Sequence, residues 1–244
     1  MKQNIKFFGI LNVTPDSFSD GGEFLDMEKA LEHAHTLILD GADFIDIGGE
    51  STRPNAAPIN STQEWERVGS ILEQLVKAYP GQISLDTRNV ETAEKFLDLG
   101  GTILNDVLGF QNPEMRALAP KFETIILMHF PGETVEDVHF QQIDSPEQVR
   151  DELLKRKAEL LEAGVSADAI ILDPGIGFGK TMECNRALLK FGELLPDEHV
   201  LIGHSRKRFL GDDRFEIEPN VEAGKIAIDS GAMYLRVHDI KGYP

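Results

Sequence analysis

Short apolar runs alternate with longer amphipathic stretches along the whole chain. The apolar runs have the length of buried strands and occupy residues 7–11, 42–47, 82–85, 102–104, 124–128, 169–172, 199–202 and 232–235. Stretches with helical periodicity lie between them, at 27–40, 62–79, 90–99, 113–119, 145–163, 182–191 and 220–229. Ser145 stands directly before Pro-Glu, so we expect it to cap the helix that follows.

This alternation predicts an α/β fold. Strands separated by helices at close spacing indicate a parallel sheet, and eight such units favour a closed barrel. The 244 residues are close to the ~250 typical of a (β/α)8 barrel, although the length alone also suits one doubly wound domain or two smaller ones. We therefore expect residues 1–244 to form a single (β/α)8 TIM barrel domain with a truncated or missing final helix.

Polar or charged residues stand at the C-terminal end of nearly every predicted strand. In (β/α)8 barrels these ends form the active-site face, and a barrel with a purely structural role has no need of them. The residues are Asn12, Glu50, Thr52, Arg53, Asp86, Asn105, His129, Asp173, Lys207, Arg236 and His238.

The stretch 171–181 joins the sixth predicted strand to the next helix. Its apolar run stops at Asp173, and Pro174 and three alternating glycines follow, which predicts a buried strand that delivers a carboxylate to a glycine-rich loop. Phe178 can offer a stacking surface and Lys180 a positive charge. Pro174 stands where a phosphate-binding P-loop needs its first glycine, so we reject that motif. An ordinary strand-to-helix turn stays open as the alternative.

Composition limits the classes of partner. The net charge of −18 argues against broad binding to nucleic acid or to anionic membranes, and no apolar run approaches the ~18 residues of a membrane span. The N-terminal apolar run is too short for a signal peptide, and a single cysteine excludes an intramolecular disulfide. We expect a cytoplasmic protein with small-molecule substrates.

Three of the strand-end residues are short hydrogen-bond acceptors. Asp86, Asn105 and Asp173, if buried together, suit a flat nitrogen-rich ring whose N–H groups pair with carboxylates. Lys207 can hydrogen-bond a ring carbonyl or steady a negative charge. The alternative for each acceptor is a simple cap at the end of a strand.

A second group of strand-end residues suits an anion. Arg53, Arg236 and His238 can contact phosphate or carboxylate oxygens, and Asn12, alone or with Asp86, can hold Mg2+, which is usually shared with substrate phosphates. Surface ion pairing is the alternative for the arginines. The sequence has no Ser-His-Asp or Cys-His set whose order along the chain suits a nucleophile and its base. We therefore expect a metal and cationic groups to assist a phosphate-type leaving group, without covalent catalysis.

Several motifs resemble those of the dihydropteroate synthases. The segment 9–21, GILNVTPDSFSDG, resembles their N-terminal signature, and 48–54, GGESTRP, resembles their second. Segments 172–180, 205–207 and 236–239 are similar to the later motifs, in the same order. The resemblance implies a (β/α)8 barrel and a Mg2+-dependent transferase of folate biosynthesis. Its reaction joins 6-hydroxymethyl-7,8-dihydropterin pyrophosphate to 4-aminobenzoate and releases pyrophosphate and 7,8-dihydropteroate.

The resemblance also implies a role for each matching residue. The residues that would hold the pterin are Asp86, Asn105, Met128, Asp173 and Lys207. Those that would hold the pyrophosphate are Thr52, Arg53, Arg236 and His238, with Asn12 as the Mg2+ ligand. Those that would border the aminobenzoate are Pro54, Phe178, Ser205 and Lys207. The implied mechanism is dissociative, and its catalytic groups would be Arg53, Asp86, Lys207, Arg236 and His238.

The chain departs from the family pattern at several places. Asn55 follows Pro54, the loop after His129 reads FPGETV, Arg208 follows Lys207, and the stretch 211–214 is short and acidic. The final helix is nearly absent, and the last helices of the family help to form its homodimer, so a homodimer of this chain would be weakened or altered. A paralogue that binds pterin with weak or no turnover, or serves as a scaffold, is one alternative.

A related barrel methyltransferase, which would use a methylated folate and a corrinoid partner, is the other alternative. The leaving-group residues argue against it, because a methyl donor needs no pyrophosphate clamp.

Overall fold

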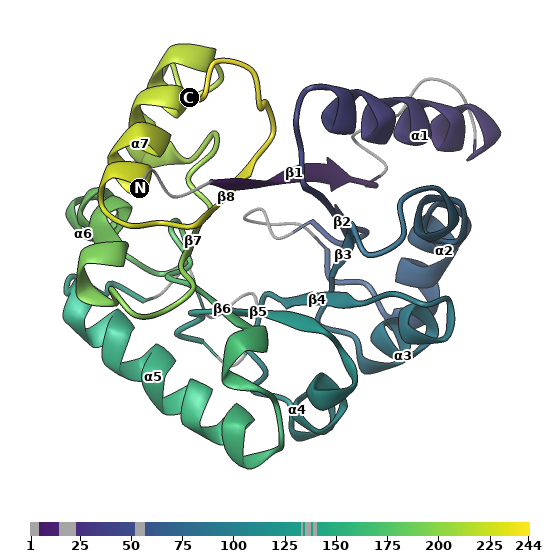
Figure 1. Ribbon diagram of the computed structural model, residues 1–244, viewed down its shortest axis with the longest axis horizontal. Helices are drawn as coiled ribbons and strands as arrows, with labels where there is room; N and C mark the ends of the chain where they lie inside the picture. The colour runs from purple at the N-terminus through teal and green to yellow at the C-terminus, as the bar shows by residue number, and fades with distance from the viewer. Residues whose placement is uncertain (1–4, 15–22, 52–56, 133, 135–137, 139–140) are drawn as a thin grey trace.

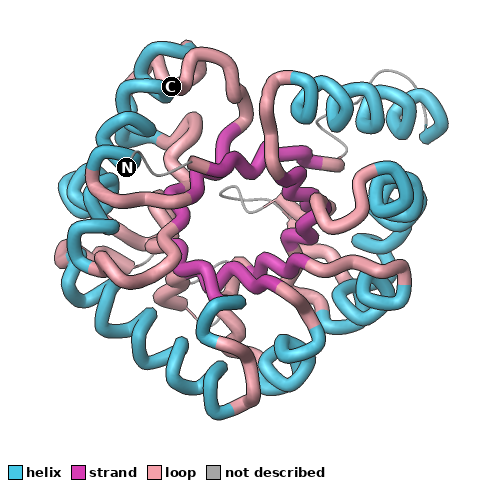
Figure 2. The backbone as a smooth tube through the Cα atoms, viewed as in Figure 1, coloured by secondary structure: helices cyan, strands magenta, loops and turns pink. Residues whose placement is uncertain are grey.

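Eight parallel strands form a ring, and the helices surround it (Figures 1 and 2). The computed structural model describes residues 5–14, 23–51, 57–132, 134, 138 and 141–244. The strands are β1 (Lys6–Asn12), β2 (Phe44–Gly48), β3 (Ile83–Asp86), β4 (Ile103–Asp106), β5 (Thr124–Met128), β6 (Ile170–Asp173), β7 (Leu201–Ile202) and β8 (Tyr234–Val237).

The sheet closes on itself. Its hydrogen-bonded order is β6-β5-β4-β3-β2-β1-β8-β7, and the two end strands meet through a parallel bridge between Leu172 and Val200. The backbone N–H of Leu172 donates to the carbonyl oxygen of His199 at 2.8 Å across that join. The predicted (β/α)8 barrel is therefore confirmed.

The helices follow the predicted order along the chain. They are α1 (Glu23–Leu39), α2 (Ser61–Ala78), α3 (Val90–Asp98), α4 (Pro113–Leu118), α5 (Pro146–Glu162), α6 (Met182–Ala187) and α7 (Ile217–Asp229). Short 3-10 turns accompany them: η2 (Ala119–Lys121), η4 (Ala167–Ala169), η5 (Leu188–Leu194) and η6 (Arg208–Leu210). No helix follows β8 within the described residues 238–244, as the sequence predicts.

Several boundaries predicted from the sequence were wrong. Helices α1 and α7 start earlier than predicted, at Glu23 and Ile217, and strands β2 and β7 start two residues later, at Phe44 and Leu201. The predicted helix 182–191 ends at Ala187 and continues as the 3-10 turn η5, where Lys190 leaves helical geometry. The chain bends there because Gly192 packs directly on the backbone after α7, and a Cβ at Gly192 would lie 2.3 Å from the carbonyl oxygen of Ser230. Strand β8 starts at Tyr234, two residues later than predicted, and Arg236 lies inside it.

An apolar cluster fills the interior of the barrel. It consists of one inward-facing residue from each of several strands: Phe8, Ile103, Ile126, Ile171 and Leu201, with Phe44 and Tyr234 packed against them. A much larger cluster, which includes Leu11, Ile45, Leu85, Leu104 and Leu172, packs between the sheet and the helices.

A polar layer lies one step above this apolar floor. Side chains of a strand alternate between the two faces, so a residue two positions after a floor residue also faces the interior, nearer the C-terminal end of the strand. The pairs of floor residue and upper residue are Phe44 and Asp46, Ile103 and Asn105, Ile126 and Met128, Ile171 and Asp173, and Tyr234 and Arg236. Among the described residues, no helix has the length and apolarity that a membrane crossing requires.

Ser145 caps helix α5 as predicted, because its hydroxyl accepts the backbone N–H of Gln148. We expect Ser145→Ala to lower the free energy of unfolding by about 1 kcal/mol, measured by urea denaturation. Ser166 is a matched control, since it precedes η4 without a side-chain capping bond. Ser166→Ala should change stability by less than about 0.5 kcal/mol. Equal losses in the two variants would show that the cap contributes nothing.

Candidate functional site

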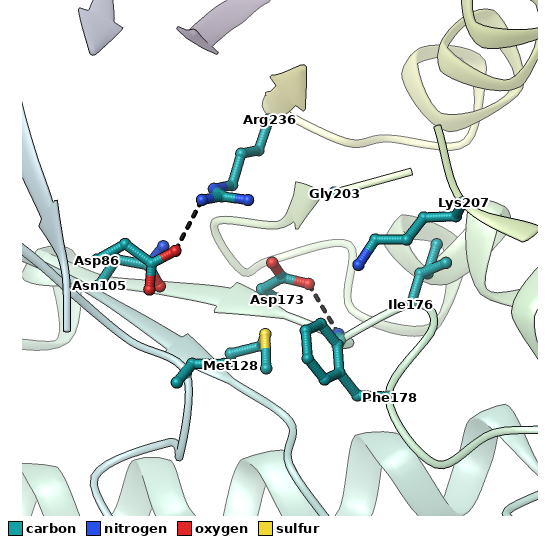
Figure 3. Close-up of a pocket in the computed structure, with 11 residues that line it drawn as sticks. Asp86, Asn105, Met128, Asp173, Ile176, Phe178, Gly203, Lys207 and Arg236 are labelled. Atoms are coloured by element: carbon teal, nitrogen blue, oxygen red, sulfur yellow. Dashed lines mark hydrogen bonds and ion pairs between the residues drawn. The ribbon is translucent and has the colours of Figure 1, made fainter. Parts of the chain in front are cut away.

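A pocket opens at the C-terminal end of the barrel, where the polar layer ends the strands (Figure 3). Strands β3 to β6 and β8 and the segments after β4, β6 and β7 contribute to it. Its lining residues are Asp86, Asn105, Val107, Met128, Asp173, Gly175, Ile176, Phe178, Gly203, Lys207 and Arg236.

The acceptor side chains come from three strands. Asp86 ends β3 and lies in register with Asn105 of β4, while Asp173 ends β6 in register with Met128 of β5 (Figure 3). The Asp173 carboxylate accepts the backbone N–H of Gly175 at 2.7 Å. Burial raises the pKa of Asp173, although this bond and the nearby cations oppose the shift. Burial likewise raises the pKa of Asp86, to about 7, while Arg236 opposes the shift.

Arg236 reaches into the barrel from β8 and joins two carboxylates. Its Nε donates to Oδ2 of Asp46 at 2.5 Å, and its Nη2 donates to Oδ2 of Asp86 at 2.7 Å. Burial alone would lower the pKa of Arg236, but the two carboxylates more than offset this and raise it. The guanidinium is therefore charged at any working pH and balances part of the negative charge of the polar layer.

Lys207 and Phe178 face the acceptors from the other side of the pocket (Figure 3). The ammonium of Lys207 lies 4.4 Å from the centre of the Phe178 ring, within range of a cation–π contact. Burial lowers the pKa of Lys207 to about 8, and Arg236 adds to this effect while Asp173 opposes it.

The glycine-rich loop after β6 gives Phe178 its place. Gly175, Gly177 and Gly179 all have positive φ, a conformation that side chains other than glycine disfavour. The backbone N–H of Gly177 donates to Oδ1 of Asn185 at 2.7 Å, which ties the loop to α6. The alternating glycines that the sequence shows are thus required by the tight path of this loop.

Lys180 does not face the pocket, which differs from its expected role as a positive charge for a ligand. Its ammonium donates to the carbonyl oxygens of Phe178 at 2.8 Å and His129 at 3.4 Å. Burial lowers the pKa of Lys180 to about 7. The residue therefore fixes the loop against the end of β5.

The five residues predicted to bind the ring line this pocket together: Asp86, Asn105, Met128, Asp173 and Lys207. Phe178, predicted to border the aminobenzoate, and Arg236, predicted to hold the pyrophosphate, line it as well. Ser205 and His238 do not line it but contact each other, with the Ser205 hydroxyl 2.9 Å from Nδ1 of His238. Asn12 ends β1 at the same edge of the barrel. Thr52, Arg53 and Pro54 lie outside the described residues.

The sequence pattern did not single out four residues of this region. Val107, Ile176 and Gly203 line the pocket, and Asp46 binds Arg236 from beneath. The sequence marks Asp46 in one way, as the charged residue inside the apolar run of β2.

The pocket has the chemistry to bind a flat ring with hydrogen-bond donors at its edge. Asp86, Asn105 and Asp173 offer acceptors, and Lys207 offers a donor to a ring carbonyl. Met128 and Phe178 add apolar surface on which the faces of a ring can pack. Among the described residues there is no cluster of three His, Cys, Asp or Glu side chains that could hold a metal ion.

Comparisons with known proteins agree with this chemistry. Residues 8–238 match a family described as pterin binding enzyme. The dihydropteroate synthase of Streptococcus pyogenes serotype M3 is 40% identical over 98% of this chain and 91% of its own length.

Two solved structures of dihydropteroate synthases are also similar. The Anaplasma phagocytophilum structure, with bound 6-hydroxymethylpterin-monophosphate, is 38% identical over 97% of this chain and 94% of its own, with a TM-score of 0.84. The Xanthomonas albilineans structure, in complex with 7,8-dihydropteroate, is 33% identical over 98% and 90%, with a TM-score of 0.82.

The position of the glycine-rich loop depends on Gly175. Its φ is +64°, and a Cβ there would lie 2.2 Å from the carbonyl oxygen of His129. We expect Gly175→Ala to lower the free energy of unfolding by about 1–3 kcal/mol more than a change at an unhindered glycine, because the loop must move away from β5.

Gly81 provides the control, since its φ is +76° and nothing lies within 4 Å of a Cβ there. Gly81→Ala should cost only the backbone strain, about 1–2 kcal/mol. Urea denaturation of the two variants measures the difference. Equal losses would contradict a close contact between the loop and β5.

Proposed function

The chain belongs to the dihydropteroate synthases, a family of pterin-binding enzymes, and on this premise we propose how its residues perform the reaction. The enzyme is a transferase that joins 6-hydroxymethyl-7,8-dihydropterin pyrophosphate to 4-aminobenzoate, with release of pyrophosphate, to give 7,8-dihydropteroate. One observation carries the assignment of residues: three acceptor side chains and one lysine converge on a single pocket at the C-terminal end of the barrel.

The ring edge of the pterin lies against the acceptors. Its amino and ring N–H groups donate to Asp86, Asn105 and Asp173, and the ammonium of Lys207 donates to its ring carbonyl. Met128 packs on the ring from below. The two carboxylates also favour positive charge on the ring, and a dissociative reaction generates that charge as the leaving group departs.

The leaving group departs toward the mouth of the barrel. Arg236 has Nη1 left for an oxygen of the pyrophosphate, since its Nε and Nη2 donate to carboxylates. The Ser205 contact fixes the His238 ring beside it. Thr52 and Arg53 complete this group in our proposal. The carbon–oxygen bond to pyrophosphate breaks before the new bond forms.

The aminobenzoate binds beyond Phe178. Its neutral amine attacks the exocyclic carbon of the pterin cation, a carbon–nitrogen bond forms, and the nitrogen then loses a proton. Phe178 and the stem of Lys207 form one wall of this site, and we assign Pro54 and Ser205 to its border. Phe178 contacts Lys207 and packs against the cluster that contains Met128, so it lies next to the pterin site as well.

The residues fit Mg2+ as the metal of this reaction. The Asn12 side chain is half-buried at the end of β1, and no hydrogen bond to another described residue occupies its amide oxygen. Mg2+ commonly takes one or two protein oxygens and completes its shell with water and substrate phosphates. When bound there, the ion would neutralise charge on the pyrophosphate oxygens.

Three further expectations from the sequence stay predictions. We propose that residues 1–244 act as one domain, because all eight strands belong to one sheet. We also propose a cytoplasmic location, which the single cysteine supports. The weakened homodimer stays a prediction as well.

Purified protein should release pyrophosphate from the dihydropterin pyrophosphate in the presence of Mg2+ only when 4-aminobenzoate is added, and should form dihydropteroate.

Asp173→Asn should weaken pterin binding by about 10- to 150-fold, because an amide nitrogen then faces a ring donor. Asp168 is an exposed control near the other end of β6, and Asp168→Asn should leave binding and turnover unchanged. If the wild-type protein binds the pterin but releases no pyrophosphate, the result would instead support the paralogue that binds pterin without turnover.

Pterin binding should have a pH optimum between about 7 and 8. Below about pH 7 Asp86 gains a proton and no longer accepts a ring N–H, and above about pH 8 Lys207 loses its charge. Each limb should approach a tenfold loss of affinity per pH unit, measured by calorimetry with 6-hydroxymethyl-7,8-dihydropterin. Lys207→Met should bind more weakly and lack the alkaline limb. An unchanged alkaline limb in that variant would refute the assignment.

A further inference from the structure

Asp46 is a buried carboxylate with no role in the reaction described so far. It stands in the middle of β2 with none of its surface exposed, and its neighbours Ile45 and Ile47 pack outward against the helices. It therefore points into the barrel, one layer above Phe44. It does not line the pocket.

Three side chains donate hydrogen bonds to Asp46. The Ser84 hydroxyl donates to Oδ1 at 2.5 Å, Nδ2 of Asn105 donates to Oδ2 at 3.0 Å, and Nε of Arg236 donates to Oδ2 at 2.5 Å. Two of these donors, Asn105 and Arg236, line the pocket. Asp46 thus lies directly behind two residues that the ligand meets.

The contact with Asn105 determines which end of its amide faces the ligand. A carboxylate only accepts hydrogen bonds, so the amide nitrogen must turn toward Asp46. The carbonyl oxygen of Asn105 is then the group left for the pocket, and it can accept a ring N–H. With a neutral group at position 46, the Asn105 amide would be free to take either orientation. The pocket would then no longer select a ligand that donates a hydrogen bond to Asn105.

The contact with Arg236 determines where the guanidinium rests. Asp46 holds Nε while Asp86 holds Nη2, so the planar group is fixed at two edges. Loss of Asp46 would leave Arg236 with Asp86 as its only carboxylate partner among the described residues. The guanidinium could then shift over Asp86 and cover an acceptor that the ring needs.

We propose that Asp46 is a positioning residue for the pterin site, which orients the Asn105 amide with its oxygen toward the ring and holds Arg236 in place beside Asp86. The inference rests on the proposed binding of the ring by Asp86, Asn105 and Asp173. It adds a source of specificity: the site prefers a ring that carries an amino group over one that carries a carbonyl at the same position.

Binding of two ligands tests this preference. The probes are 6-hydroxymethylpterin and 6-hydroxymethyllumazine, in which a carbonyl replaces the 2-amino group, each titrated by calorimetry. Wild-type protein should prefer the pterin. Asp46→Asn should weaken pterin binding by at least about tenfold and reduce the pterin-to-lumazine preference severalfold, because the Asn105 amide can turn over.

Glu64→Gln is the matched control. Glu64 is another fully buried carboxylate, but its partners Thr87 and Asn89 do not line the pocket. This variant should lose stability and yet keep the wild-type preference between the two probes. An Asp46→Asn variant that keeps the preference as Glu64→Gln does would show that Asp46 is only structural, and would overturn the proposal.

An exchange of the two side chains covers the case in which Asp46→Asn fails to fold. Asp46→Asn combined with Asn105→Asp retains one carboxylate and one amide in contact, with an acceptor oxygen again toward the pocket. The double variant should bind the pterin more tightly than Asn105→Asp alone. Binding that is no tighter would overturn the inference.

Wild-type protein that binds neither probe would refute the proposed function, and the inference with it. Wild-type protein that prefers the pterin, together with an Asp46→Asn variant of unchanged preference, would refute the inference alone.

Discussion

The guanidinium of Arg236 bridges a buried and a half-buried carboxylate inside the barrel, and the rest of the site depends on this contact. Asp46 and Asp86 come from β2 and β3, while Arg236 comes from β8 on the other side of β1. Buried carboxylates are costly unless a cation and hydrogen bonds compensate them. With Arg236 in place, the barrel can hold a third carboxylate, Asp173, close by and still present acceptors to a ligand.

The same alternation along the strands produces both the stable interior and the site. Phe8, Ile126 and Ile171 belong to a floor that excludes water from the lower half of the barrel. Because the next inward positions are polar, the upper half contributes little apolar burial. Most of the apolar burial therefore lies in the cluster between the sheet and the helices, and the polar layer can serve binding without emptying the core.

The sequence predicted the barrel and the acceptors because both leave a local signal. Asp86 and Asp173 each end an apolar run, so their place on the active-site face follows from the strand that precedes them. Asp46 has apolar neighbours on both sides, and only the register of β2 with β3 shows that it meets Ser84. The turn of Lys180 toward backbone carbonyls depends on the fold of its loop. The early end of α6 depends on the packing of Gly192, which no local pattern records.

Under the proposed function, the charges of the site imply that different groups recognise the ring and attract the pyrophosphate. The chain carries a net charge of −18, which repels an anionic substrate at long range. Inside the pocket, Arg236 is already matched by two carboxylates, and Lys207 lies near Asp173. The polar layer therefore has little unpaired positive charge to offer an anion. It recognises the ring through the direction of its hydrogen bonds. Under the proposed function, attraction for the pyrophosphate must therefore come from groups outside this layer and from a metal bound with the substrate.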